Sequence, residues 1–346
     1  MSILLKIKGA TINAVKKVAL FFTVIRPNER QALTNLDLAE IFLALLPAGI
    51  FGCLLFGKRA IITLALCAAV CLLVAFLWDV IFNRKNLKID FKSALMGYIL
   101  GLTITSGVKL PYIIVISVMT TIISKAFFRN NPLSLVFPVL IAKVFFSVFF
   151  FKAFSAFPLP FENVITEMTP IMYLFESYPP DFAAKDLFFG LHSGYIGQTS
   201  ECLIIVGAIY LMLRKFINPI ICGFFLATSA VLSIIFKQDL ALSLLGGGLF
   251  FTALFLTMDY CLMPNAIYKK ILYGITCGIL TFTIRPMLGG EGALLAVLIC
   301  NVAFSIVTRR NIKRLIKFFK HPNFRRLFEK LWQIVLKAFK IKKSER

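Results

Sequence analysis

The chain has 346 residues, of which 59% are hydrophobic and 16% charged, and its formal net charge is +22. Soluble domains are about half apolar and about a quarter charged, so the composition excludes an ordinary soluble protein. Apolar runs of about 20 residues, the length that crosses a bilayer, recur along the sequence. We predict an all-α polytopic membrane protein, because a β-barrel would instead show alternating segments of about ten residues.

Ten predicted membrane spans follow one another along the chain, several of them short for a full crossing. Short or glycine-interrupted segments are typical of broken helices that line a site in transporter-like folds. An even number of spans puts both termini on one side of the membrane. The predicted spans are 37–56, 60–82, 93–106, 110–128, 133–151, 199–214, 217–236, 241–259, 268–285 and 291–308.

Most of the positive charge lies in the two end segments, 1–34 and 309–346. Basic segments favour the cytoplasmic side and attract anionic lipid, so we predict cytoplasmic termini, lipid contact and no nucleic-acid partner. Residues 3–25 are predicted to form a helix on the membrane surface. The tail has apolar residues among its lysines, which indicates an amphipathic helix on the inner leaflet or a dock for a cytoplasmic subunit.

The spans divide into two halves of five, which predicts two related repeats. Because five is odd, such repeats must be inverted relative to each other, and binding sites then lie at their interface. In both halves a segment that contains Arg and Pro, Lys125–Pro132 or Arg285–Gly292, precedes the last span. The predicted parts are an N-terminal cytoplasmic or interfacial helix (1–34), a first five-helix repeat (35–151), an external loop (152–198), a second five-helix repeat (199–308) and a basic cytoplasmic tail (309–346).

Charged residues inside the predicted spans are functional candidates, because burying a charge in a bilayer is costly. Asp79 and Asp259 lie near span ends, where reaching water is the simpler interpretation. Glu40 and Lys143 lie deeper, and they could pair with each other or line an ion path.

Four glycine-rich segments have two different interpretations. Gly97–Gly101 and Gly274–Gly278 have the spacing that lets two helices approach closely, so we predict packing contacts. Gly246–Gly248 and Gly289–Gly292 contain consecutive glycines, which indicate a helix break or backbone placed against a ligand. Neither matches a nucleotide-binding loop.

The sequence contains no zinc motif, catalytic triad or kinase signature. Its eight cysteines lie mostly in apolar segments and are expected to pack as small apolar residues. The two histidines, His192 and His321, are far apart in the sequence. We therefore predict no metal site and no catalytic side chain, so any reaction would need a bound cofactor.

An acidic, aromatic and proline-rich insert, residues 152–186, separates the two apolar halves. It contains Thr166 and Thr169, three residues apart, and Pro170 follows the second. We expect the chemistry of the protein to lie in this insert, on the outer side of the membrane.

From Leu187 onward the sequence resembles the RnfD/NqrB family, the flavin-carrying membrane subunits of ion-translocating oxidoreductases. Residues 187–201 are similar to the family segment GxxxGxIGETS, and residues 246–259 to its "GG-hydrophobic-F-MATD" segment. Further matches, in the same order along the chain, are Gly278–Thr281, Ile284-Arg285, Glu291-Gly292, Asn301 and, near the N-terminus, Arg26–Arg30 and Leu45–Ala48. By length, the chain resembles the RnfD members, which belong to Rnf-type electron transport complexes, more than the NqrB members.

The resemblance implies a cofactor and the residue that carries it. In this family a threonine after the fifth span is esterified to the phosphate of FMN, and Thr169 is the matching position, with Thr166 at the preceding serine. The family's Gly-Ala pair before that threonine is Glu167-Met168 here, and its acidic residue six positions before it is Asn163. Asp259, Arg285 and Glu291 are further candidate cofactor-binding residues.

The resemblance also implies a setting for the protein. The partners would be the other subunits of an Rnf/Nqr-type complex and a flavin transferase, in a bacterial inner membrane. The protein would relay electrons between ferredoxin or NADH and NAD or quinone, coupled to Na⁺ or H⁺. A second flavin, riboflavin included, is implied near Asn131-Pro132. Two other functions stay open: a secondary transporter or channel without a redox cofactor, and a structural subunit without flavin.

Overall fold

The computed structural model describes residues 33–82, 90–127, 134–162, 164–166, 169–174, 183–258 and 266–307. The chain divides into two compact units, 1–301 and 302–346. The second unit is described only in residues 302–307, which form the end of helix α14. The predicted surface helix at 3–25 and the basic tail at 309–346 lie outside the described residues.

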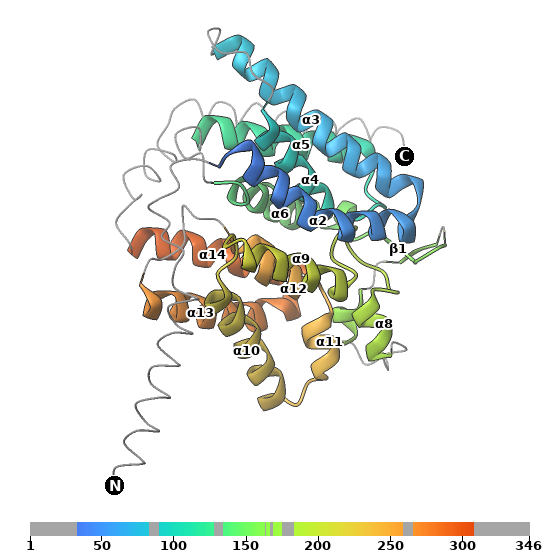
Figure 1. Cartoon of the computed structure of the whole chain (residues 1–346). Helices are drawn as coiled ribbons and strands as arrows, with labels where there is room; N and C mark the ends of the chain where they lie inside the picture. The colour runs from blue at the N-terminus through green and yellow to red at the C-terminus, as the bar shows by residue number, and fades with distance from the viewer. Residues whose placement is uncertain are drawn as a thin grey trace. The chain divides into compact units, whose positions relative to one another are not determined.

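Most of the described structure is helical, with connecting turns and one short strand pair, and each predicted span has a helical counterpart (Figure 1). Among the described residues, three helices are long and apolar enough to cross a membrane, and they cover Asn35–Phe56, Lys58–Ile81 and Ile267–Leu288. Six shorter apolar helices of 10–17 residues accompany them. The prediction of an all-α polytopic membrane protein is confirmed.

The first half contains five of the predicted spans. Helix α2 begins where the Oγ1 of Thr34 accepts the Asp37 backbone N–H at 3.2 Å and the Asp37 carboxylate accepts the Thr34 N–H at 2.9 Å, a capping box. Helix α4 ends earlier than predicted, because Thr103–Gly107 turns and the Oγ1 of Thr105 donates to the Ala156 carbonyl at 2.7 Å. The helices are α2 (Asn35–Phe56), α3 (Lys58–Phe82), α4 (Phe91–Leu102), α5 (Leu110–Phe127), α6 (Phe137–Phe149) and α7 (Phe151–Phe154).

The second half contains a broken helix at the predicted glycine run. Helix α11 stops at Leu245, and Gly247 and Gly248 have φ angles of 65° and 62°, which favour glycine because they lie in the left-handed region. The chain then resumes as α12 and a π-helical turn, η2. The elements are α9 (Glu201–Leu213), α10 (Pro219–Ile235), α11 (Leu240–Leu245), α12 (Leu249–Phe251), η2 (Thr252–Leu256), α13 (Ile267–Leu288) and α14 (Glu291–Val307).

The two halves repeat part of their packing order. In the first half α3 packs on α4 and α5, and in the second half α10 packs on α11 and α13. The first helices of the halves, α2 and α9, pack on each other, and a Cβ added to Gly207 would lie 2.3 Å from the Ala44 carbonyl oxygen. The division into two inverted five-span repeats stays a prediction.

The predicted glycine packing contacts are present. A Cβ on Gly97 of α4 would lie 2.4 Å from the Cys67 carbonyl oxygen of α3, and one on Gly278 of α13 would lie 2.6 Å from the Thr228 Cβ of α10. Any larger side chain would push these helix pairs apart, so the spacing serves helix packing.

The segment predicted as one external loop, 152–198, consists of two different parts. Its first part contains the strands β1 (Phe157–Pro158) and β2 (Ile165–Thr166), which pair antiparallel, the 3₁₀ turn η1 (Pro170–Leu174) and helix α8 (Ala184–Phe189). Its last part, 192–198, is buried. There the Ile196 and Gly197 N–H groups donate to the Ile104 and Leu102 carbonyls, at 3.1 and 2.9 Å.

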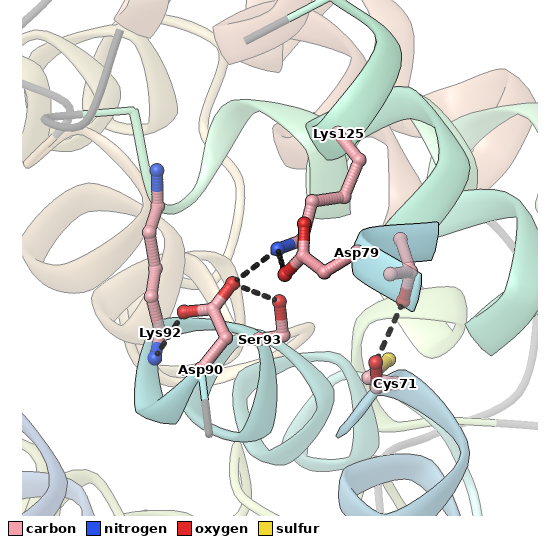
Figure 2. A network of polar contacts seen from close by, with 7 residues as sticks. Cys71, Asp79, Asp90, Lys92, Ser93 and Lys125 are labelled. Carbon is pink, nitrogen blue, oxygen red and sulfur yellow. Dashed lines mark hydrogen bonds and ion pairs between the residues drawn. The ribbon is translucent and has the colours of Figure 1, made fainter. Parts of the chain in front are cut away.

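An ion-pair network joins the ends of α3, α4 and α5, and we call Asp79, Asp90, Ser93 and Lys125 the end network (Figure 2). The Lys125 Nζ lies 2.9 Å from a carboxylate oxygen of Asp79 and 2.9 Å from one of Asp90. The Ser93 hydroxyl donates to Asp90 at 2.8 Å. Asp79, expected to reach water at a span end, is instead paired, with its side chain 15% exposed.

One ammonium, that of Lys125, faces both carboxylates of the end network. Burial alone would raise the pKa of the Asp90 carboxyl, but the hydrogen bond and the positive charge of Lys125 outweigh burial and hold that pKa below its ordinary value. The network therefore ties three helix ends together, and Lys125 stabilises the charged form of Asp90.

Candidate functional site

Four polar side chains meet in the interior, and we call Lys143, Ser147, Tyr195 and Glu291 the central cluster. The Lys143 Nζ lies 2.5 Å from the Glu291 Oε1 and 3.2 Å from the Ser147 Oγ. The Tyr195 hydroxyl donates to the same Glu291 oxygen at 2.7 Å. Helix α6 supplies Lys143 and Ser147, the buried segment before α9 supplies Tyr195, and the first residue of α14 is Glu291, so the cluster joins both halves of the chain.

The Lys143–Glu291 pair is deeply buried. Lys143 is 0% exposed and Glu291 is 7% exposed. The Lys143 ammonium also lies 5.0 Å from the ring centre of Phe154 and 4.9 Å from that of Tyr195, where the ring faces attract a cation. Desolvating two charges often costs more than their attraction returns, so this pair is weak evidence for stability and stronger evidence for a function.

The suggested pairing of Glu40 with Lys143 is wrong. Glu40 instead pairs with Arg214 at the end of α9, with the Arg214 Nε 2.9 Å from the Glu40 Oε2. The Arg214 side chain is 54% exposed, so this ion pair lies at the surface. Lys143 takes its partner from α14, 148 residues along the chain.

A small cavity adjoins the central cluster, and we call it the central cavity. Its volume is about 20 Å³, which is room for about one water molecule. The hydroxyls of Ser147, Ser155, Thr169 and Tyr195 belong to its lining residues, together with Glu291. The remaining lining residues are Phe151, Phe154, Phe157, Met172, Leu288, Gly289 and Gly290.

The structure separates the two threonines of the insert. Thr169 is 5% exposed and lines the central cavity, whereas Thr166 is half-buried in β2. Thr169 was expected on an open external loop, but η1 follows it directly and packs on α11. Asn163, Glu167, Met168 and the candidate Asp259 lie outside the described residues.

Arg285 stabilises the broken helix α11. Its guanidinium donates to the Ser243 carbonyl at 2.5 Å and to the Gly246 carbonyl at 3.1 Å. The last carbonyls of a helix have no partner within the helix and carry partial negative charge. A buried arginine there supplies both the missing hydrogen-bond donors and a compensating positive charge. Arg285 and Glu291, both candidate cofactor residues, thus belong to two different polar groups.

Sequence reasoning missed several buried polar residues in and before α9. Glu201 is fully buried and interacts electrostatically with Arg285, and within the described residues its two carboxylate oxygens have no hydrogen-bond partner. Gln198 and the Nε2 of His192 are in the same situation. The signal that could have found Glu201 is its position inside a predicted span, and Tyr195 gave no such signal.

Within the described part of the chain, no group of three or more His, Cys, Asp or Glu side chains could hold a metal ion. The polar groups available to a ligand near the central cluster are one carboxylate, one ammonium and several hydroxyls. Such a set can exchange a proton or a small cation, and it can position a charged ligand.

Comparison with known proteins gives relatives over most of the chain. The D subunit of the Na⁺-translocating ferredoxin:NAD⁺ oxidoreductase complex of Acetobacterium woodii is 26% identical over 282 residues, 80% of this chain and 88% of the relative. The D subunit of the proton-translocating ferredoxin:NAD⁺ oxidoreductase complex of Clostridium ljungdahlii is 25% identical over 292 residues, 78% of this chain and 88% of the relative.

A third relative matches a shorter stretch. The D subunit of the ion-translocating oxidoreductase complex of Stutzerimonas stutzeri is 31% identical over 137 residues, 37% of this chain and 38% of the relative. The profile of the NQR2, RnfD, RnfE family matches residues 29–317, which include the central cluster, Arg285 and the whole insert. The chain therefore belongs to the NQR2, RnfD, RnfE family.

Proposed function

We propose that this chain is the D subunit of a membrane complex that couples electron transfer between ferredoxin or NADH and NAD or quinone to the translocation of Na⁺ or H⁺. The observation that carries the proposal is the match with two D subunits over about four fifths of the chain. The buried Lys143–Glu291 pair supports it, because charges inside a membrane protein mark ion paths more often than they add stability.

The proposal includes an FMN phosphoester on the Thr169 hydroxyl. FMN, when bound, supplies one- and two-electron chemistry that no side chain offers. The surroundings of this hydroxyl do not fit the flavin as they are folded here: Thr169 is 5% exposed and the central cavity measures about 20 Å³, against about 300–1,000 Å³ for pockets of small-molecule ligands. Attachment of FMN therefore requires residues 169–174 to leave the closed arrangement.

The other candidate cofactor residues receive different roles in this proposal. Glu291 shares the central cavity with Thr169 and would lie near the attachment point. Arg285 is occupied by two carbonyls of the α11 end, so we assign it to holding the broken helix. Asp259 stays a candidate from the family resemblance alone.

The setting we propose follows the sequence. The protein lies in a bacterial inner membrane with both termini in the cytoplasm, among the other subunits of the complex. The basic tail, 309–346, contacts anionic lipid. A flavin transferase supplies the FMN.

The test is the covalent flavin itself. The chain is produced with a flavin transferase, denatured and examined for in-gel fluorescence under ultraviolet light, and its intact mass is measured. We expect a fluorescent band and one added FMN phosphoester in the wild type and in Thr166→Ala, and neither in Thr169→Ala. Fluorescence that survives Thr169→Ala would exclude this attachment site, and an unmodified wild type would exclude the covalent flavin.

A second candidate function is that of a secondary transporter without a redox cofactor. The broken helix α11–α12–η2 favours it, because discontinuous helices often surround transported ions. An unmodified wild-type mass, together with ion uptake into vesicles that contain this chain alone, would favour the transporter over the redox subunit.

A further inference from the structure

One oxygen of the buried Glu291 carboxylate has no hydrogen-bond partner within the described residues. The Glu291 Oε1 accepts from both Lys143 and Tyr195, whereas the Oε2 is buried and has no hydrogen-bond partner within the described residues. An unsatisfied charged oxygen costs more than a neutral one. Because Glu291 also lines the central cavity, the missing partner is best supplied by something that enters this cavity.

The chemistry of the cavity wall selects the kind of partner. Besides the Glu291 carboxylate, the lining residues Ser147, Ser155 and Thr169 carry hydroxyl oxygens, and oxygen is the ligand atom that hard cations prefer. A volume of about 20 Å³ suits one small ion rather than a hydrated or organic one. A divalent ion usually takes more than one carboxylate or keeps several waters, and the adjacent Lys143 ammonium would repel it further.

We infer that the central cavity is a binding site for a small alkali cation, Na⁺ or Li⁺, in which the cation competes with the Lys143 ammonium for the Glu291 carboxylate. Lys143 serves as a tethered cation: it neutralises Glu291 when the site holds no ion and withdraws from it when an ion binds. The rings of Phe154 and Tyr195, about 5 Å from its Nζ, keep part of the ammonium's stabilisation after it withdraws.

The residues of the cation site come from different parts of the chain, so cation binding is linked to the positions of the helices. The competing groups come from α6 and α14, one in each half of the chain, and Thr169 comes from the insert. A change in the position of either helix, or the opening of residues 169–174, alters the same set of oxygens. The inference deepens the proposed function, on which its physiological meaning rests, by naming the ion class and its site, but cation binding itself needs neither flavin nor electron transfer.

The test measures Na⁺ binding by the full-length chain, purified in detergent without flavin. Binding of ²²Na⁺ is measured with choline chloride holding the ionic strength constant, and thermal unfolding is followed in NaCl, LiCl and choline chloride. Lys143→Met, which removes the competitor, should bind Na⁺ about tenfold more tightly than the wild type, a change of about 1.4 kcal/mol. The double variant Lys143→Met/Glu291→Gln should lose this binding.

The matched control is Lys125→Met, which removes a lysine from the end network. It should bind Na⁺ as the wild type does, because Lys125 pairs with Asp79 and Asp90 and is not among the residues of the cavity wall. Equal Na⁺ affinities of Lys143→Met and the wild type would overturn the inference, as would equal stabilisation by choline and Na⁺.

Two further variants keep the test decisive where Lys143→Met does not fold. Ser155→Ala and Ser147→Ala each remove one hydroxyl from the wall and should weaken Na⁺ binding about tenfold, and unchanged affinity in both would overturn the inference. A chain that binds Na⁺ when purified without flavin, but gains no FMN when it is produced with the flavin transferase, would contradict the proposed cofactor and not this site. A flavinylated chain without Na⁺ binding would do the reverse.

Discussion

The end network and the central cluster both join helices through a lysine and carboxylates, yet their surroundings differ. In the end network Lys125 contacts two carboxylates, and the side chains of Asp79 and Asp90 are 15% and 28% exposed, so water helps to solvate the charges. In the central cluster one ammonium faces one carboxylate, with side chains 1% and 9% exposed, and one carboxylate oxygen has no partner within the described residues.

The difference separates charges that hold helices together from charges that are able to exchange partners. The carboxylates at the helix ends each contact Lys125 and are partly exposed to water, so a further ion would add little there. A buried pair with an unsatisfied oxygen and an adjoining cavity can accept a competing partner at low cost. Each variant below changes one side of this contrast, and the expected loss of stability decreases from the first to the last.

The largest loss is expected for Glu291→Gln. The substitution keeps the shape of the side chain but leaves the Lys143 ammonium buried without a counter-charge, which costs about 3–5 kcal/mol in buried pairs. Equilibrium unfolding in mixed micelles, followed by circular dichroism, measures the free energy of unfolding.

The control for Glu291→Gln is the double variant Lys143→Met/Glu291→Gln, in which neither charge remains. It should recover most of the lost stability, because two neutral side chains of similar size need no desolvation of charge. A single variant as stable as the wild type would mean that water reaches Lys143 and that the contrast with the end network is false.

Arg285→Met should cause the second largest loss. It leaves the Ser243 and Gly246 carbonyls without their charged donor and deprives the buried Glu201 carboxylate of its nearby positive charge. Hydrogen bonds to charged groups contribute about 1.5–3 kcal/mol, so a loss of that size is expected in the same unfolding measurement.

Arg285→Lys distinguishes charge from shape at this position. It keeps the positive charge but not the planar fork that reaches two carbonyls at once. We expect it to recover part of the stability. Full recovery would show that only the charge beside Glu201 is needed.

Gly248→Ala tests the break in α11 that brings Arg285 to these carbonyls. Gly248 has a φ of 62°, and an added Cβ would lie 2.0 Å from the Gln198 Oε1. A non-glycine residue in a left-handed conformation costs about 1–3 kcal/mol. Gly223→Ala is the matched control, because among the described residues no atom beyond its own helix backbone lies within 4 Å of its added Cβ, and alanine inside a helix gains about 0.5–1 kcal/mol. Losses of equal size in both variants would contradict a special role for the break.

The sequence was sufficient to predict most of the helices. Apolar runs such as 37–56 and 60–82 coincide with α2 and α3 within a few residues, because membrane spans depend on local composition alone. The break at Gly246–Gly248 was predictable for the same reason, because consecutive glycines interrupt a helix at their own position. Lys143 was recognised because a lysine within an apolar span is unusual on any fold.

The partners of these residues could not be predicted, because they depend on which distant helices meet. Glu40 was the acidic partner suggested for Lys143 by the sequence, yet Glu291 of the second half lies beside it. Tyr195 and the buried segment 192–198 look like part of a loop in the sequence, and only their backbone bonds to the end of α4 explain why they lie inside. The burial of Thr169 follows from the same long-range packing.

The smallest effect concerns pH and the end network. The pKa of Asp90 is lowered in the folded protein, so its contribution to stability is complete above the ordinary aspartate pKa of about 4 and is lost as pH falls through the lower folded value. Asp90→Asn should therefore lower the unfolding midpoint slightly at pH 7, where the contribution of Asp90 is complete, and flatten the decline of the midpoint below about pH 4. Asp79→Asn, which leaves Lys125 with one carboxylate, should cost about 1 kcal/mol or less at pH 7. A loss of stability as large as that of Glu291→Gln would mean that the end network is as poorly solvated as the central cluster. Only the adjoining cavity would then distinguish the central cluster, whose charges can exchange partners, from the end network, whose charges hold helices together.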